Sequence, residues 1–116
     1  MAAHFLPSAA RPVPGAAFAM KTLGITKGVR TEYDHYMLQL HDGAKLDTRY
    51  QENCSRTPVS LPAGATWFVY TDLVSHAVLS GQYVLEQTVH VPVAAMQDPA
   101  LSPLRMLEKA IGRDLA

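Results

Sequence analysis

The sequence predicts an α+β fold: N-terminal helices, then the C-terminal strands of a double-stranded β-helix (a jelly-roll or cupin-like architecture), then a closing C-terminal helix. Two patterns predict it. An apolar helical period occupies the first half. Residues 57–93 contain Pro/Gly turns between segments with strand character, and the last of these, residues 83–93, alternates between apolar and polar side chains. We expect one domain with a basic, Pro-rich arm and short helix (1–30), a helical segment (31–56), a β half-roll (57–93) and a C-terminal helix (94–116).

The clearest predicted helix runs from Thr31 to Asp42. Thr31 can cap its N-terminus, and acidic residues follow in the first turn, where the helix dipole favours negative charge. Gly43 is a natural C-terminal stop. Apolar side chains recur at helical spacing and predict one buried stripe: Tyr33, Tyr36, Met37 and Leu40.

Three shorter elements complete the helical prediction. Gly15 to Leu23 is expected to be a short apolar helix, and Ala44 to Gln51 a short helix or turn, followed by a loop from Glu52 to Arg56. In the last helix, Ser102 is the expected cap, Pro103 takes the first position and Gly112 ends it. Its buried stripe is expected to be Leu104, Leu107 and Ile111.

The β half is predicted from Thr57 onward. Pro62-Ala63-Gly64 and Ser80-Gly81 have turn chemistry, and Thr66 to Thr71 is rich in aromatic and β-branched residues. Residues 83–93 alternate with period 2, which is typical of a strand with one buried face.

Composition excludes several classes of function. Ten basic and ten acidic residues cancel, and the few aromatic residues are not interleaved with basic ones, so nucleic-acid binding is not expected. The single cysteine, Cys54, permits no internal disulfide and predicts a reducing compartment. No apolar run approaches the ~18 residues of a membrane span.

The N-terminal third is locally basic, because no acidic residue precedes Glu32. Such a face could approach the phosphates of a glycolipid or membrane, and a solvated arm is the equally good alternative. Its basic residues are Arg11, Lys21, Lys27 and Arg30.

His76 is the best candidate for a metal ligand. It follows Thr71-Asp72 at a corner between predicted strands, where iron enzymes of jelly-roll architecture often place one histidine. Such enzymes also need a His-x-Asp/Glu pair, and no histidine of this chain is followed two residues later by an acid. A purely structural histidine therefore remains an open alternative. We expect surface, capping or hydrogen-bonding roles for the remaining histidines, and neither Ser75 nor Ser80 lies in a nucleophile motif.

Several segments carry a family resemblance: Arg30–Gly43, Tyr50–Gln51, Thr66–Trp67, Thr71–Ala77, Ser80–Gln82, Leu85–Thr88 and Ser102–Glu108. Together they resemble the C-terminal part of the Kdo hydroxylases, over nearly the whole chain. Those enzymes are Fe(II)/2-oxoglutarate-dependent dioxygenases that hydroxylate the 3-deoxy-D-manno-octulosonic acid (Kdo) sugar of bacterial lipopolysaccharide and lipid A.

The resemblance implies that His76 is the distal iron ligand and that the cofactors are Fe(II) and 2-oxoglutarate. It also implies that the His-x-Asp pair lies upstream of the matched region, so that this chain is the C-terminal portion of a larger enzyme and inactive alone. No Lys or Arg occurs between Arg56 and Arg105 to bind the far carboxylate of 2-oxoglutarate. Ser80, Gln87 and Thr88 are the remaining polar candidates for the cofactor or the substrate.

Partner and location follow from the same resemblance. Kdo-containing lipid A is the expected substrate, reached in the cytoplasm at the inner face of the cytoplasmic membrane. Whether this chain is an enzyme stays open. The alternative is a non-enzymatic module: either a cupin-like binding protein, or an oligomerisation module that forms a homodimer through open strand edges.

Overall fold

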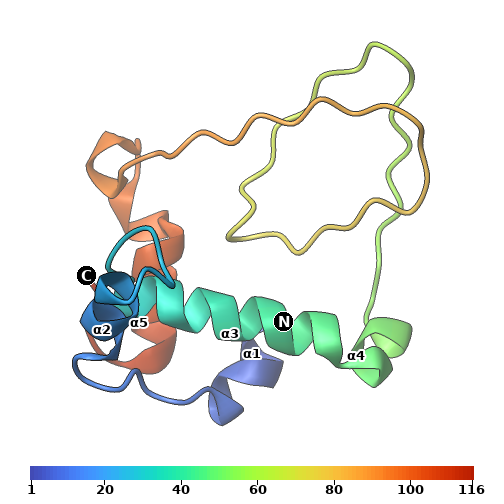
Figure 1. Ribbon diagram of the computed structural model, residues 1–116. Coiled ribbons are helices and arrows are strands. Elements are labelled where there is room, and N and C mark those ends of the chain that lie inside the picture. Colours follow the sequence, from blue (N-terminus) through green and yellow to red (C-terminus); the bar gives the residue numbers. More distant parts are fainter.

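A small helical body and one long excursion make up the molecule (Figure 1). The computed structural model describes all 116 residues. Its elements are α1 (Ala2–Phe5), the 3-10 helix η1 (Leu6–Ser8), α2 (Ala16–Thr22), α3 (Glu32–Leu46), α4 (Thr48–Asn53), the 3-10 helices η2 (Val93–Ala95) and η3 (Pro99–Leu101), and α5 (Pro103–Ile111). Residues 54–92, here called the extended segment, leave the body after α4 and return to it at η2.

The longest helix, α3, begins where the sequence predicts. The Thr31 side chain accepts a hydrogen bond from the Asp34 backbone N–H at 3.1 Å, and the Asp34 carboxylate accepts one from the Thr31 N–H at 3.0 Å. This reciprocal pair satisfies two backbone donors that a helix start leaves free.

The predicted end of α3 at Gly43 is wrong, because the helix continues to Leu46. Gly43 instead makes room for a neighbour: a Cβ there would lie 3.0 Å from a ring carbon of Phe5 in α1. The following helix, α4, therefore begins later than the predicted Ala44, and the Asp47 side chain caps it by accepting from the Tyr50 N–H at 2.8 Å.

The C-terminal helix α5 follows its prediction at both ends. The Ser102 hydroxyl accepts from the Arg105 N–H at 3.2 Å, Pro103 is the first residue, and Gly112 closes the helix in the left-handed region with φ 80°. Of the predicted stripe, Leu107 is buried, and Leu104 and Ile111 are partly buried.

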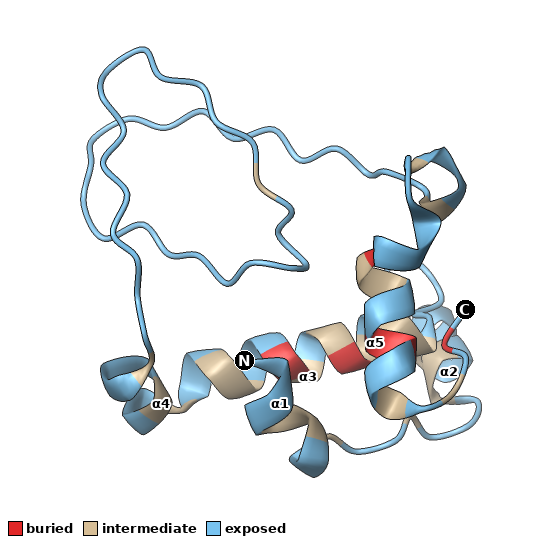
Figure 2. Ribbon diagram, turned by 180° about the vertical axis from the view of Figure 1, so that it is seen from behind, coloured by how far each residue is buried: buried red, intermediate tan, exposed pale blue.

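The core lies where α3 and α5 meet. Its buried apolar residues are Tyr36 and Leu40 from α3, Leu107 from α5, and Leu115 from the C-terminal tail. Part of the predicted N-terminal arm also folds against this core, because α1 packs on α3 and Phe5 and Leu6 cover the buried cluster. Figure 2 shows the buried positions confined to α3, α5 and the residues flanking α5.

Polar contacts fix the C-terminal tail onto the same core. The Glu108 carboxylate accepts from the Leu115 N–H at 3.0 Å and from the Arg105 guanidinium at 2.6 Å. The Leu115 hydrogen bond and then Arg105 lower the pKa of Glu108 below its ordinary value. Arg113 donates to the Tyr36 hydroxyl at 3.2 Å and forms an ion pair with Glu32.

The jelly-roll prediction is contradicted, because the structure contains no β-strand. Residues 57–93 run as an extended, unpaired trace, and from Ser75 to Val91 no backbone group hydrogen-bonds to another. A strand requires a ladder of hydrogen bonds to a neighbouring strand, and alternation of side chains alone does not supply that neighbour.

The alternating side chains of residues 83–93 consequently have no surface to pack against. The apolar face predicted for residues 83–93 is not buried: Tyr83 is 97% exposed and Leu85 fully exposed. The whole chain makes 47 backbone–backbone hydrogen bonds. A globular protein of this length makes roughly 75. The shortfall reflects the unpaired segment, whose backbone groups are left to water.

No helix combines the length and apolar character needed to cross a bilayer.

Truncating the core should unfold the helical body. Leu40→Ala removes a side chain that is 2% exposed, and such truncations lower the free energy of unfolding by about 3 kcal/mol. The matched control is Leu46→Ala on the same helix, whose side chain is 80% exposed and whose loss should change stability by less than about 0.5 kcal/mol. Urea unfolding followed by helical circular dichroism measures both. Equal losses in the two variants would contradict the placement of the core.

Candidate functional site

The predicted cofactor residues all lie on the extended segment. His76, Ser80, Gln87 and Thr88 are exposed to solvent. The structure records no hydrogen bond among them, and neither of the two hollows described below is lined by any of them. The extended segment therefore carries these side chains without assembling them into one site.

His76 is nevertheless oriented by its own backbone. Its Nδ1 lies 3.1 Å from the Val74 carbonyl oxygen, and its ring meets that of Trp67 edge-on with centroids 6.2 Å apart. A carbonyl oxygen only accepts, so Nδ1 must carry the proton. In the neutral imidazole the lone pair then resides on Nε2, which leaves that nitrogen free to bind a metal.

The other histidines lie apart from His76, two of them beside polar groups of the helical body. His35 Nε2 lies 3.1 Å from the Ala10 carbonyl oxygen, and His4 lies 3.6 Å from the Asp47 carboxylate and stacks near Tyr50. His41 and His90 are exposed, and their side chains make no hydrogen bond.

The residues present do not make a complete iron site. No group of three His, Cys, Asp or Glu side chains comes together anywhere in the chain. The non-heme iron centre of dioxygenases takes two histidines and one carboxylate. Of that set, the sequence predicts His76 alone, and the structure brings no further possible ligands together with it.

A turn just before His76 ties the extended segment to the helical body. The Leu73 and Val74 N–H groups both donate to the Tyr70 carbonyl, at 3.0 and 3.1 Å. Within this turn, the Asp72 carboxylate accepts a hydrogen bond of 2.6 Å from the Tyr33 hydroxyl on α3. Burial and then the hydrogen bond to Asp72 raise the pKa of Tyr33 well above its ordinary value, so the phenol remains a donor.

A hollow of ≈ 330 Å³ lies beside the same turn. Tyr70 and Leu73 form one wall, and the other wall comes from residues that lead into α5, among them Val91, Met96, Leu101 and Pro103. The middle of the extended segment thus lies close to the place where that segment returns to the helical body.

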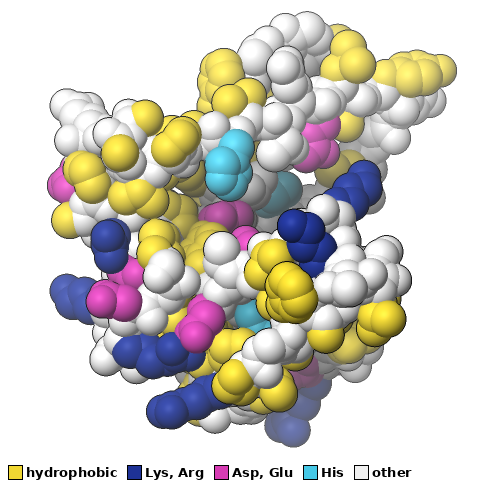
Figure 3. Space-filling model, turned by 60° about the vertical axis from the view of Figure 1, so that its left-hand side comes forward, with side chains coloured by type: hydrophobic (Ala, Val, Ile, Leu, Met, Phe, Trp, Pro, Cys, Tyr) yellow, Lys and Arg dark blue, Asp and Glu magenta, His cyan; other side chains and the backbone are white.

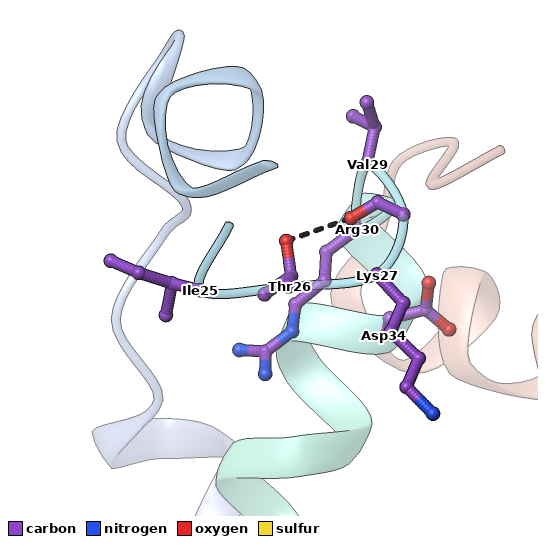
Figure 4. A pocket seen from close by; sticks show the side chains of 7 residues that line it. Ile25, Thr26, Lys27, Val29, Arg30 and Asp34 are labelled. Atoms are coloured by element: carbon purple, nitrogen blue, oxygen red, sulfur yellow. Dashed lines mark hydrogen bonds between the residues drawn. The ribbon is translucent and has the colours of Figure 1, made fainter. Parts of the chain in front are cut away.

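Of the basic residues singled out by the sequence, the structure brings two together. Lys27 and Arg30 line an open hollow of ≈ 380 Å³ formed by the loop before α3, with Asp34 beside them (Figure 4). Arg11 and Lys21 do not line it, and none of the four basic side chains forms an ion pair.

In Figure 3, Lys and Arg side chains lie mainly over the lower part of the molecule, and apolar side chains are spread openly over the upper part.

One family of known proteins matches this chain over nearly its whole length. The family model of 3-deoxy-D-manno-oct-2-ulosonic acid (Kdo) hydroxylase matches residues 1–114. The chain belongs to the Kdo hydroxylase family.

Solved structures of one Kdo hydroxylase, KdoO, resemble this chain closely. In the complex of KdoO with α-ketoglutarate and Fe(III), the identity is 50% and the TM-score 0.92, over 99% of this chain and 39% of that chain. The succinate and Fe(III) complex gives 50% identity and a TM-score of 0.91, over 98% and 39%. The cobalt(II) complex gives the same identity and TM-score, over 98% and 38%. A comparison with curated proteins found no match.

KdoO as a whole is a non-heme Fe(II), α-ketoglutarate-dependent dioxygenase. The present chain spans about two fifths of the length of the KdoO chain, and over that length its backbone follows the same path. The path of residues 54–92 is part of this shared backbone course.

Proposed function

We propose that this chain takes part in Fe(II)- and 2-oxoglutarate-dependent hydroxylation of the Kdo sugar of lipid A, with His76 as an iron ligand. The observation that carries the proposal is the match to KdoO at 50% identity over 99% of the chain. The free Nε2 of His76 supports it, because that atom has the lone pair that iron requires.

The chain alone is proposed to be inactive. One histidine cannot supply the His-x-Asp pair, so the two further iron donors must come from outside the residues described here. The role of Ser80, Gln87 and Thr88 in holding 2-oxoglutarate or the sugar is part of the same proposal. All three are exposed and unpaired in hydrogen bonds, so they remain available to a ligand.

The basic residues are proposed to face the glycolipid. Lys27 and Arg30 share one open hollow with Asp34, and two cations that form no ion pair attract phosphate or carboxylate groups. Arg11 and Lys21 extend the same basic character along the N-terminal third. This arrangement favours an approach to lipid A at the inner face of the cytoplasmic membrane.

A chimera tests the enzymatic proposal. This chain replaces the matching part of KdoO, and Fe(II) with 2-oxoglutarate is added without oxygen while the visible charge-transfer band is recorded. We expect a band and Kdo hydroxylation from the chimera, loss of both in His76→Ala, and neither from the isolated chain. His90→Ala is the matched control, because His90 is also exposed on the extended segment, and it should retain the band.

The outcomes of this experiment test separately the enzymatic role, the ligand assignment of His76 and the inactivity of the isolated chain. A chimera that melts cooperatively but gives no band would contradict the enzymatic role, and a band that survives His76→Ala would contradict the ligand assignment. A band from the isolated chain would show a complete site and overturn its inactivity.

A second candidate function is oligomerisation, favoured by the unpaired backbone of residues 75–91. Exposed strand-like edges pair readily with another chain, and we expect the isolated chain to form a homodimer through this segment.

Sedimentation equilibrium over a range of concentrations measures the mass. Charges at the most exposed apolar positions, Tyr83→Lys with Leu85→Lys, should give the monomer, because a buried charge disfavours association. Leu46→Lys on α3 is the control and should leave the dimer intact. A wild-type chain that stays monomeric at every concentration would refute this candidate.

A further inference from the structure

The contact between Tyr33 and Asp72 joins parts of the chain that are 39 residues apart. Apart from Arg56, which donates to the Gln51 carbonyl at the start of the extended segment, no other side-chain hydrogen bond between oxygen or nitrogen atoms links this segment to the helical body. Near it, the Ser75 hydroxyl lies 2.8 Å from the Met1 sulfur, a weak acceptor. Both contacts lie shortly before His76, at Asp72 and Ser75. No side chain between residues 77 and 91 makes a hydrogen bond to the helical body.

Tyr33 is suited to act as an anchor. Its ring packs against the buried cluster of α3 and α5, so its position is set by the core and not by the extended segment. Its hydroxyl reaches the Asp72 carboxylate at 2.6 Å, a short hydrogen bond to a charged acceptor. Such a bond is roughly twice as strong as one between neutral groups.

The turn at residues 70–74 connects the position of Asp72 to that of His76. Asp72 lies inside the turn closed by the Leu73 and Val74 N–H groups on the Tyr70 carbonyl. Val74 offers the carbonyl that holds Nδ1 of His76. Fixing Asp72 on α3 therefore fixes the Val74 carbonyl, and through it the ring of His76. Without that anchor, the turn would belong to an exposed segment with no other strong contact nearby.

We propose that Tyr33 is a positioning residue for His76, acting through its hydrogen bond to Asp72 and the turn 70–74. It sets which imidazole nitrogen carries the proton and where Nε2 points. The consequence for metal binding rests on the proposed function of His76 as an iron ligand, whereas the effect on the imidazole itself does not.

The test uses the full chain and the nitrogen chemical shifts of the His76 ring, measured by long-range ¹H–¹⁵N correlation above pH 8. We expect the wild type to show the Nδ1-protonated tautomer as the major form. Tyr33→Phe keeps the ring in the core and removes only the hydroxyl, so the helical content should stay unchanged while the tautomer shifts toward Nε2-protonated imidazole. Asp72→Ala, which removes the acceptor, should give the same shift, and Asp72→Asn, which keeps an acceptor oxygen, should restore part of the wild-type signal.

Tyr50→Phe is the matched control. Tyr50 is a half-buried tyrosine whose hydroxyl makes no hydrogen bond, so this variant should leave the His76 spectrum unchanged. A general loss of structure would lower the melting temperature of Tyr33→Phe and broaden signals throughout the chain. Unchanged His76 shifts in a folded Tyr33→Phe variant would overturn the proposal.

A second readout separates this proposal from the metal proposal. Titration with Co(II) alone broadens signals near the bound ion, and we expect broadening at His76 to need about tenfold more Co(II) in Tyr33→Phe, as for other residues that orient a ligand. Broadening at His76 that is equal in both proteins contradicts positioning but keeps the ligand assignment. No broadening at His76 in the wild type contradicts the ligand assignment, and the tautomer measurement still decides the positioning role.

Discussion

The pairing requirement of the extended backbone governs this structure. A helix satisfies its own N–H and C=O groups, so α3 and α5 form wherever their caps and apolar stripes allow. An extended segment satisfies none of them without a neighbour. Residues 54–92 have no such neighbour, and their apolar side chains lie in solvent, with Phe68 95% exposed. All the buried apolar residues therefore belong to the helical body and its C-terminal tail.

That division explains which parts of the fold the sequence predicts. The start of α3 and both ends of α5 are encoded locally, by Thr31, by Ser102-Pro103 and by Gly112. The end of α3 could not be predicted in the same way. Gly43 does not end the helix but leaves room for the ring of Phe5, which lies 38 positions earlier in the sequence. The predicted strands failed for a related reason: alternation specifies which side chains share a face, but not whether another strand is present to pair with.

The candidate site shows the same contrast. His76 is predicted as a ligand from its place after Thr71-Asp72 and from the family resemblance, and it remains a prediction with which a free Nε2 is compatible. The anchor at Tyr33 could not, because the apolar stripe of α3 accounts for this tyrosine as a core residue and gives no sign of its hydroxyl partner. Ser80, Gln87 and Thr88 remain predictions, since their exposed side chains contact nothing that would define a site.

Amide hydrogen exchange of the isolated chain, followed residue by residue by NMR, tests the central claim most directly. The account predicts slow exchange in the centre of α3 and α5, where hydrogen-bonded amides adjoin the core, and exchange near the rate of an unfolded peptide from Val84 to Val91. The measurement is made at a concentration at which the chain is monomeric. Alternating protection along residues 84–91 in that monomer would mean that these residues pair as a strand within the chain, and it would contradict the account.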